Sequence, residues 1–248
     1  MFFRAIKLMK SKRELLDQLT LREKCDLGSG SDTWHSKPVP RLGIRSLLMH
    51  DGPHGLRKQL KTADHLGLNE SVPATCFPTA GILACSFDRD LLWKIGAALG
   101  SEALEQEIDI VLGPGVNIKR SPLCGRNFEY FSEDPLLTGE LAAAFIRGVQ
   151  SQGVGTSLKH FAAYNQEFCR LINNSQIDER ALREIYLKPF EIAVRKAQPW
   201  TVMASYNRLN GEYSVQHREL LTEILRKDWG FSGLVVTDWA AMDNRLLA

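Results

Sequence analysis

Four short apolar runs in this sequence each stop at a side chain that can bind a ligand or move a proton. The runs and the side chains that follow them are Ser46–His50 before Asp51, Gly155–Leu158 before Lys159 and His160, Thr201–Ser205 before Tyr206, and Gly233–Thr237 before Asp238. Short apolar, β-branched runs bounded by glycine are typical of strands buried on both faces of a parallel sheet. We therefore expect the stretch Gly233–Trp239 to be a fully buried strand that ends in a carboxylate.

Segments with a helical period separate these runs. Apolar residues recur at three- and four-residue spacing from the N-cap Asp88 to about Gln106, and Asp134 before Pro135 predicts the start of a second helix. Further helices are expected from Arg13 to Cys25, from Asp178 to Ala197 with a kink at Pro189, and from His217 to Trp229. Alternating strands and helices indicate βαβ units and a parallel sheet.

The polar strand ends distinguish between the two common parallel-sheet folds. In a (β/α)8 barrel the carboxyl ends of all strands surround one opening, whereas an open doubly wound sheet gathers ligands only at its switch point. The sequence therefore favours an α/β fold of the TIM-barrel type. We expect six strands, counting Ile108–Leu112 and the apolar run Thr79–Ala84, and a seventh if one lies between Leu171 and Ile177. Since a closed barrel needs eight, this barrel is expected to be incomplete at its C-terminus.

Composition argues against several kinds of partner and compartment. Lys and Arg number 31 and Asp and Glu 29, a net charge of +2, so neither nucleic acid nor an anionic membrane is expected as a partner. The five cysteines form no C-x-x-C pair, which argues against a structural zinc or a disulfide framework. Met1–Lys10 lacks the pattern of a signal peptide, and no stretch is apolar enough to span a membrane. We expect a cytoplasmic protein without a metal or cofactor.

Two loops carry further candidate chemistry. The segment Gly113–Pro135 holds two arginines and two glutamates, which suggests a clamp for hydroxyls and carboxylates, although a solvated loop with surface ion pairs is an equal alternative. His50 and His54 flank Asp51, but without a third ligand at helical spacing they do not indicate a metal site.

Taken together, several motifs resemble the N-terminal barrel of family 3 glycoside hydrolases, in particular the β-glucosidase branch. These motifs are Leu48–Pro53, the Lys119–Pro135 loop, Ser157–Phe161, Asp178–Arg180 with Leu182–Tyr186, Met203–Asn207 and Val236–Trp239. They occur in order from about Leu21 to Ala248. The resemblance implies a truncated barrel domain over residues 41–248, preceded by a lead-in helix and loop over residues 1–40.

The resemblance also implies roles for single residues. Asp238 resembles the nucleophile that forms a covalent glycosyl-enzyme, and Asp51 resembles the carboxylate that holds hydroxyls of the sugar being cleaved. The other residues implied to contact the substrate are Arg126, Lys159, His160, Arg170, Met203, Tyr206 and Trp239. Tyr206 would steady the nucleophile, and nearby Arg and Lys would keep it ionised. The implied activity is hydrolysis of terminal, non-reducing β-D-glucosyl residues with retention.

The acid/base carboxyl of that reaction is not assigned. In the β-glucosidase branch it is expected from a second α/β domain after the barrel, and this sequence lacks that domain, so the chain alone is expected to turn over weakly or not at all. Glu129, Glu133 and Glu167 remain candidates within the chain. The β-N-acetylglucosaminidase branch carries a His/Asp pair after its Lys-His strand, but Phe161–Phe168 contains no histidine, which disfavours that branch.

Three alternatives stay open at this point. In the first, the chain is a non-catalytic fragment or subunit that needs a partner chain, which would bind at the unclosed edge of its sheet. In the second, it is a different barrel enzyme that uses Lys159 as a Schiff-base amine. In the third, it acts on β-xylosides or arabinosides in place of β-glucosides.

Overall fold

The computed structural model describes residues 12–60 and 69–242. The chain divides into two compact units, one ending at Met49 and one beginning at His50. Met1–Lys10, on which the absence of a signal peptide was predicted, lie outside the described residues. Within the described ranges no helix is long and apolar enough to cross a membrane.

The first unit contains two short helices, α1 (Lys12–Gln18) and α2 (Leu21–Leu27), and a 3-10 turn at Pro40–Leu42. The single helix predicted from Arg13 to Cys25 is wrong, because Thr20 between the two helices is extended and caps α2. Its hydroxyl accepts a hydrogen bond from the backbone N–H of Glu23, whose carboxylate accepts one from the backbone N–H of Thr20.

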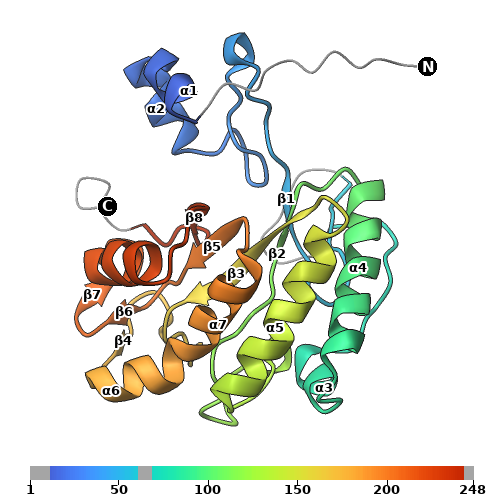
Figure 1. Cartoon of the computed structure of the whole chain (residues 1–248), viewed down its shortest axis with the longest axis vertical. Coiled ribbons are helices and arrows are strands. Elements are labelled where there is room, and N and C mark those ends of the chain that lie inside the picture. Colours follow the sequence, from blue (N-terminus) through green and yellow to red (C-terminus); the bar gives the residue numbers. More distant parts are fainter. Residues whose placement is uncertain (1–11, 61–68, 243–248) are drawn as a thin grey trace. The chain divides into compact units, whose positions relative to one another are not determined.

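The second unit is built on a five-stranded sheet in the order β1-β2-β3-β5-β8 (Figure 1). Its strands are β1 (Met49–Asp51), β2 (Ile110–Leu112), β3 (Gly155–Phe161), β5 (Thr201–Ala204) and β8 (Leu234–Thr237). β2, β3, β5 and β8 pair in parallel. The order follows the chain, which is the arrangement of a barrel wall and not of a doubly wound sheet.

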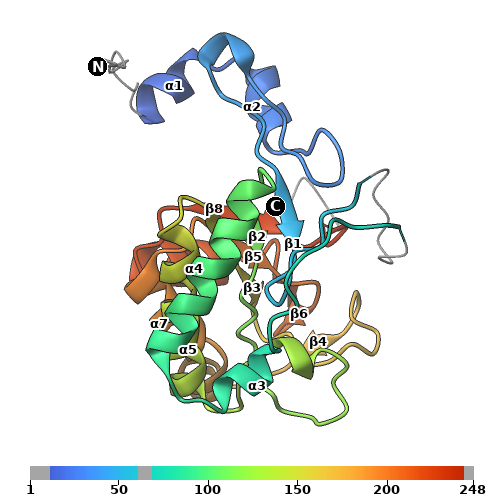
Figure 2. The ribbon, with the colours of Figure 1, turned by 90° about the vertical axis from the view of Figure 1, so that its right-hand side faces the viewer.

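Three helices cover one face of this sheet: α4 (Arg89–Glu105), α5 (Pro135–Gln150) and α7 (Lys188–Ala197) (Figure 2). The predicted caps of the first two are confirmed, since Asp88 and Asp134 accept hydrogen bonds from backbone N–H groups of their first turns. Helices α4 and α5 pack closely because of glycine: a Cβ at Gly148 would lie 2.1 Å from the carbonyl oxygen of Trp93.

The predicted break at Pro189 is also confirmed. The segment from Asp178 divides into α6 (Glu179–Ala181), a π-helical turn (Leu182–Tyr186) and α7, which has Pro189 in its first turn. The helix expected from His217 to Trp229 is a π-helical segment, Glu219–Asp228.

The strand count differs from the expectation. The run Thr79–Ala84 forms a helix, α3 (Ala80–Ala84), which buries Ala80, Leu83 and Ala84 at helical spacing. The strand sought between Leu171 and Ile177 exists as β4 (Asn174–Ser175), but it belongs to a separate three-stranded sheet with β6 (Arg208–Leu209) and β7 (Glu212–Tyr213). The main sheet therefore has five strands among the described residues.

The expectation of a fully buried last strand is wrong as well. Every residue of β2 and β3 is buried, whereas Leu234 at the start of β8 is 51% exposed and the rest of β8 is half-buried. The reason is position, because β8 ends the sheet order and pairs only with β5 in the described structure. The sequence of β8 is as apolar as that of a strand in the interior of a sheet, although β8 lies at the edge of the described sheet.

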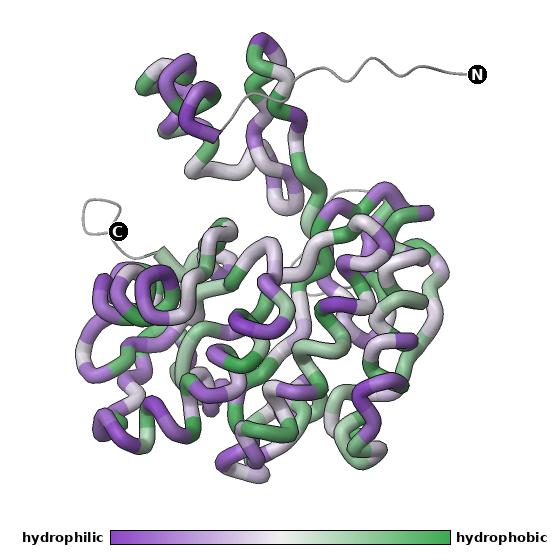
Figure 3. The backbone as a smooth tube through the Cα atoms, viewed as in Figure 1, coloured by the Kyte–Doolittle hydropathy of each residue, from purple (hydrophilic) through white to green (hydrophobic). Residues whose placement is uncertain are grey.

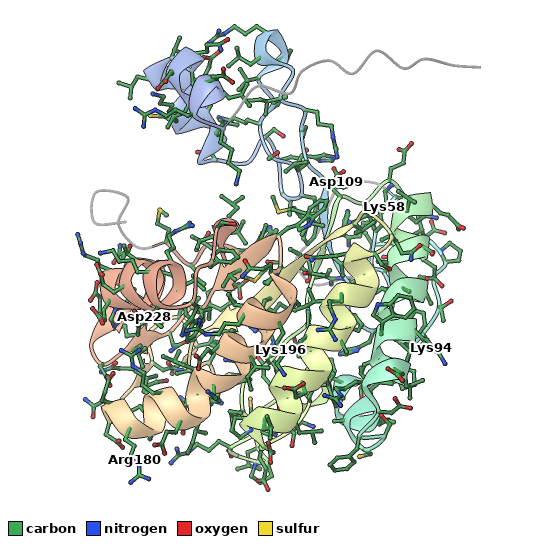
Figure 4. The ribbon with its side chains drawn as sticks, in the orientation of Figure 1. Lys58, Lys94, Asp109, Arg180, Lys196 and Asp228 are labelled. Atoms are coloured by element: carbon green, nitrogen blue, oxygen red, sulfur yellow. The ribbon has the colours of Figure 1, made fainter. Side chains whose placement is uncertain are left out.

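Polarity follows this architecture. In the second unit the central strands are largely apolar, and hydrophilic residues lie along the outer sides of the helices (Figure 3). Charged residues such as Lys94 on α4, Arg180 on α6 and Asp228 are exposed on that outer side (Figure 4). Polar side chains inside the unit are therefore exceptions: Thr138, Thr156 and Thr201 lie in a helix or near strand starts, whereas Lys159, His160 and Asp238 lie at the carboxyl ends of strands.

Candidate functional site

The side chains predicted to meet at the strand ends do meet. Lys159 Nζ lies 3.4 Å from Asp51 Oδ1, which joins β3 to β1, and His160 Nε2 lies 3.7 Å from Asp238 Oδ2, which joins β3 to the residue after β8. Lys159, His160 and Asp238 are buried, and the Asp51 side chain is about one third exposed. We call these four residues the strand-end cluster.

Asp51 is held as an ionised acceptor. Arg57 Nη2 donates to Asp51 Oδ2 at 2.8 Å, on the side opposite Lys159. Although burial acts to raise it, the two cations hold the pKa of the Asp51 carboxyl below its ordinary value. Arg57 was missed by the sequence analysis, because five residues of loop separate it from Asp51 without a recognisable motif.

Arg126 and Glu129 of the Gly113–Pro135 loop pair with each other. Arg126 donates through Nε to Glu129 Oε2 at 2.8 Å and through Nη2 to Glu129 Oε1 at 3.0 Å, a bidentate pair. Lys159 Nζ is 3.7 Å from Glu129 Oε1, so this carboxylate serves two cations. Burial acts to raise the pKa of Glu129, but Lys159 and Arg126 lower it below its usual value. The Arg126 and Glu129 side chains are only 18% and 8% exposed, so this pair is not a surface ion pair, whereas Arg120 and Glu133 of the same loop are exposed.

His160 is fixed in one protonation state. Its Nε2 lies 2.8 Å from Arg126 Nη2, and its Nδ1 lies 3.1 Å from the hydroxyl oxygen of Tyr130. Burial, reinforced by Arg126 and Lys159, holds the pKa of His160 well below its ordinary value. The ring is therefore neutral at pH 7 and does not form a charged pair with Asp238.

Asp238 is buried at the end of β8. Its Oδ1 accepts a hydrogen bond from the backbone N–H of Trp239 at 2.8 Å, and its Oδ2 has no hydrogen-bond partner within residues 12–60 and 69–242. Burial raises the pKa of the Asp238 carboxyl above its ordinary value, and the Tyr206 hydroxyl, Lys159 and Arg126 oppose that rise without cancelling it. The net direction is opposite to the one expected from nearby cations alone.

A second group of interacting side chains surrounds Tyr206. The guanidinium of Arg170 stacks 4.8 Å from the centroid of the Tyr206 ring and donates to Glu167 Oε2 at 3.2 Å. Glu167 Oε1 in turn accepts a hydrogen bond from the Tyr164 hydroxyl at 2.5 Å and lies 3.9 Å from Arg126 Nε. Arg170, which comes from the loop after β3, is thereby connected to the strand-end cluster.

The remaining predicted residues are placed as follows. Met203 is a buried residue of β5 and pairs with Val236 of β8. Trp239 is half-buried directly after Asp238. The residues that the sequence analysis did not single out are Arg57, Tyr130 and Tyr164. Tyr130 and Tyr164 belong, with Tyr206, to one apolar cluster of the core, so only their hydroxyl contacts mark them as part of the site.

The described residues contain no group of three or more His, Cys, Asp and Glu side chains arranged to hold a metal ion. The strand-end cluster offers one buried and one partly exposed carboxylate, the Lys159 ammonium and a neutral imidazole, and Arg126 adds a second cation beside it. Such a set can bind several hydroxyl groups at once and can present one carboxylate as a nucleophile or base.

Comparison with known proteins identifies the family. The model of the glycosyl hydrolase family 3 N terminal domain matches residues 34–246. Thermostable beta-glucosidase B of Acetivibrio thermocellus is 60% identical over 94% of the chain, and an exo-alpha-(1->6)-L-arabinopyranosidase of Bifidobacterium longum is 55% identical over 92%. The chain spans 31% and 30% of the length of these two relatives.

Solved structures give the same result for the fold. Beta-glucosidase 3B from Thermotoga neapolitana in complex with glucose superposes with a TM-score of 0.87 at 46% identity, covering 94% of this chain and 34% of that one. A Bifidobacterium adolescentis GH3 beta-glucosidase gives 0.87 at 51% identity over 94% of this chain and 33% of its own. The prediction of an incomplete TIM-type barrel is confirmed, and the chain belongs to glycosyl hydrolase family 3 through the N-terminal domain of that family.

Proposed function

We propose that this chain is the barrel of a retaining β-glucosidase, which holds the terminal glucosyl unit and supplies the nucleophile. The observation that carries the proposal is the strand-end cluster itself. Asp51, Lys159, His160 and Asp238 come from three strands that are far apart in the sequence, yet they are linked by contacts of 3.4 and 3.7 Å. Similarity to proteins named beta-glucosidases supports the same activity.

Asp238 is the nucleophile in this proposal. Its Oδ2 lacks a hydrogen-bond partner among the described residues, so one oxygen is available for bond formation with the anomeric carbon. Lys159 and Arg126 act to keep the carboxyl ionised against the effect of burial. Tyr206, whose hydroxyl also lowers the pKa of Asp238, steadies it.

Asp51 and its neighbours bind the sugar. An ionised carboxylate accepts hydrogen bonds from hydroxyls, and Lys159, Arg126 and Arg170 donate them. His160 is neutral and accepts from Arg126, so it orients that guanidinium. Met203 and Trp239 line the floor near the nucleophile. Lys159 is ion-paired with Asp51 and Glu129, and a paired ammonium is unsuited to Schiff-base chemistry.

The general acid comes from outside the strand-end cluster. A retaining enzyme needs a protonated carboxyl about 5 to 5.5 Å from the nucleophile. Glu129 is unsuited to this role, because its two cations lower its pKa, whereas a general acid requires a raised one. We infer that a second domain or a partner chain supplies the acid, and that residues 41–248 form the barrel domain with residues 1–40 as a lead-in.

An α-L-arabinopyranoside is the second candidate substrate, because a relative named for that activity is 55% identical. L-Arabinopyranose lacks the exocyclic hydroxymethyl group of glucose, so a matched pair of aryl glycosides distinguishes the two. We also infer a reducing compartment such as the cytoplasm, since the five cysteines are unpaired.

The proposal is tested by hydrolysis of aryl β-glucosides with good and poor leaving groups. The wild-type chain is expected to cleave dinitrophenyl β-glucoside slowly and methyl β-glucoside not at all, because only the second needs an acid. Asp238→Asn should abolish the slow cleavage, and Glu133→Gln, in the same loop as Arg126, should leave it unchanged. Equal rates for wild type and Asp238→Asn would refute the proposal.

A further inference from the structure

Two adjoining cavities lie outside the strand-end cluster, since none of its four residues lines them. The larger, of about 650 Å³, is formed by the loop after β2 and the loop after β3, and the smaller, of about 460 Å³, adjoins β4 and β6. They share the lining residues Gln176 and Ile177 and are therefore direct neighbours. We call the two together the amide groove, after its five carboxamide side chains, Asn165, Gln166, Asn174, Gln176 and Asn210.

Four of the five carboxamides are only partly used inside the protein, whereas Asn210 bonds through both Oδ1 and Nδ2 to the backbone of Ile177. Asn165 and Gln166 each donate one hydrogen bond to a backbone carbonyl, and Asn174 accepts one from a backbone N–H. Gln176 is exposed, and no hydrogen bond of its side chain occurs among the described residues. Asn165, Gln166, Asn174 and Gln176 therefore keep donor or acceptor capacity among the residues that line the groove.

The lining matches a neutral, hydroxylated ligand. A carboxamide offers both a donor and an acceptor, as does a sugar hydroxyl. Phe168, with 81% of its surface exposed, and Leu123 supply apolar surface at the rim of the larger cavity. Arg120 and Glu167 bring one charge of each sign to that cavity, so it has no preference for an ion.

Glu167 connects the groove to the strand-end cluster. Its carboxylate lines the larger cavity and also accepts hydrogen bonds from the Tyr164 hydroxyl and from Arg170. Arg170 stacks on Tyr206, whose hydroxyl acts on Asp238. Trp239 does not line either cavity, so the groove leaves the cluster in a direction different from that of the tryptophan.

We propose that the amide groove binds a further sugar unit of an oligosaccharide whose terminal unit occupies the strand-end cluster. The proposal rests on the proposed function for the place of the terminal unit. In this proposal Gln176 and its neighbours determine which oligosaccharides the barrel selects. Only a glycosidic linkage that directs the second ring past Glu167 would place that ring in the groove.

The test is a titration of the complete chain, followed by amide and side-chain carboxamide NMR signals. The ligands are methyl β-glucoside and four glucose disaccharides, with β-1,2, β-1,3, β-1,4 and β-1,6 linkages. At least one disaccharide should bind more tightly than methyl β-glucoside and should shift the Gln176 side-chain signals. Gln176→Ala should weaken that disaccharide by about three- to tenfold, the factor expected for one net hydrogen bond, and should leave methyl β-glucoside unchanged.

Gln152→Ala is the matched control, because Gln152 follows α5 near the amino end of β3 and bonds to Ser101, away from the groove. It should change neither affinity. If no disaccharide binds better than methyl β-glucoside, or if Gln176→Ala has no effect, the groove is not a sugar site, even though the proposed function stands. If the disaccharides shift the groove but no sugar perturbs Lys159 or Asp51, the proposed function fails and only a separate sugar site remains. A chain that responds to no sugar overturns both.

Discussion

Arg126 donates a hydrogen bond to Nε2 of His160 at 2.8 Å. A guanidinium has no acceptor, so Nε2 must carry a lone pair, and the proton of the neutral ring sits on Nδ1, directed at the Tyr130 oxygen 3.1 Å away. A charged imidazole would place a proton against the guanidinium, which is the physical basis of the lowered pKa of His160.

The first prediction concerns this ring. Nitrogen-15 NMR of the imidazole should show the Nδ1-protonated tautomer, with no titration around the ordinary histidine pKa of 6.5. Arg126→Met removes the donor and one cation, and the pKa of His160 should then rise. A ring that titrates at its ordinary value in the wild type would contradict the geometry.

The second prediction concerns the buried pair of Arg126 and Glu129. Their side chains are 18% and 8% exposed, so Arg126→Ala leaves a buried carboxylate with only Lys159 as counter-charge. The free energy of unfolding should fall by about 3 kcal/mol, measured by urea denaturation. Arg89→Ala is the control, because Arg89 is 64% exposed in its pair with Glu140, and its loss should cost less than about 1 kcal/mol. Equal losses for the two variants would show that Arg126 is solvated.

The third prediction concerns Asp238. A carboxyl whose pKa is raised on folding destabilises the fold once it ionises, so its stabilising contribution is present at low pH and is lost as pH rises through the folded pKa. Asp238→Asn should therefore unfold at higher urea than the wild type at pH 7, and the difference should shrink as pH approaches the ordinary Asp value of 3.8. A variant less stable than the wild type at pH 7 would refute the raised pKa.

Asp51 and Glu129 should behave in the opposite way. Their pKa values are lowered, so the stability they contribute is present above their unfolded values and is lost as pH falls through the folded ones. Asp51→Asn should cost stability at pH 7, and this cost should disappear in acid. At pH 7 the two substitutions should therefore change the free energy of unfolding in opposite directions: Asp51→Asn should lower it and Asp238→Asn should raise it.

The fourth prediction concerns the contact of α4 with α5. Gly148→Ala places a methyl group 2.1 Å from the Trp93 carbonyl oxygen, which backbone movement must relieve, and stability should fall by about 1 to 3 kcal/mol. Gly125→Ala is the control, since its methyl would meet only Glu167 Cγ at 3.7 Å. Thermal unfolding of both variants tests this, and an unchanged Gly148→Ala would show that the helices pack less closely.

Much of the fold could be predicted from local signals. Asp88, Asp134 and Pro189 act through their immediate neighbours, so their caps and break were predictable from the sequence. Thr79–Ala84 was mistaken for a strand, because a short apolar run has no period long enough to distinguish strand from helix. Leu234 was expected to be buried, but its exposure depends on what lies beside β8, which the run itself does not encode.

In the site, too, the residues marked by local signals could be predicted, and those whose contacts depend on the rest of the fold could not. Asp51, Lys159, His160 and Asp238 stand at strand ends, and the order of a parallel sheet brings such residues together. Arg57 and Tyr130 come from loops whose course depends on the whole unit, so their contacts with Asp51 and His160 could not be predicted from spacing. The direction of the Asp238 pKa depends on the depth of burial, which outweighs the neighbouring cations.

The role of Asp238 is tested most directly by trapping with an activated 2-deoxy-2-fluoro-β-glucoside, followed by peptide mass spectrometry. The fluorine slows hydrolysis of the glycosyl-enzyme, and the activated leaving group removes the need for an acid. One 2-fluoroglucosyl group should be found on the peptide that contains Asp238, and none on the Asp238→Asn variant. A label on any other residue would contradict the assignment of Asp238 as the nucleophile.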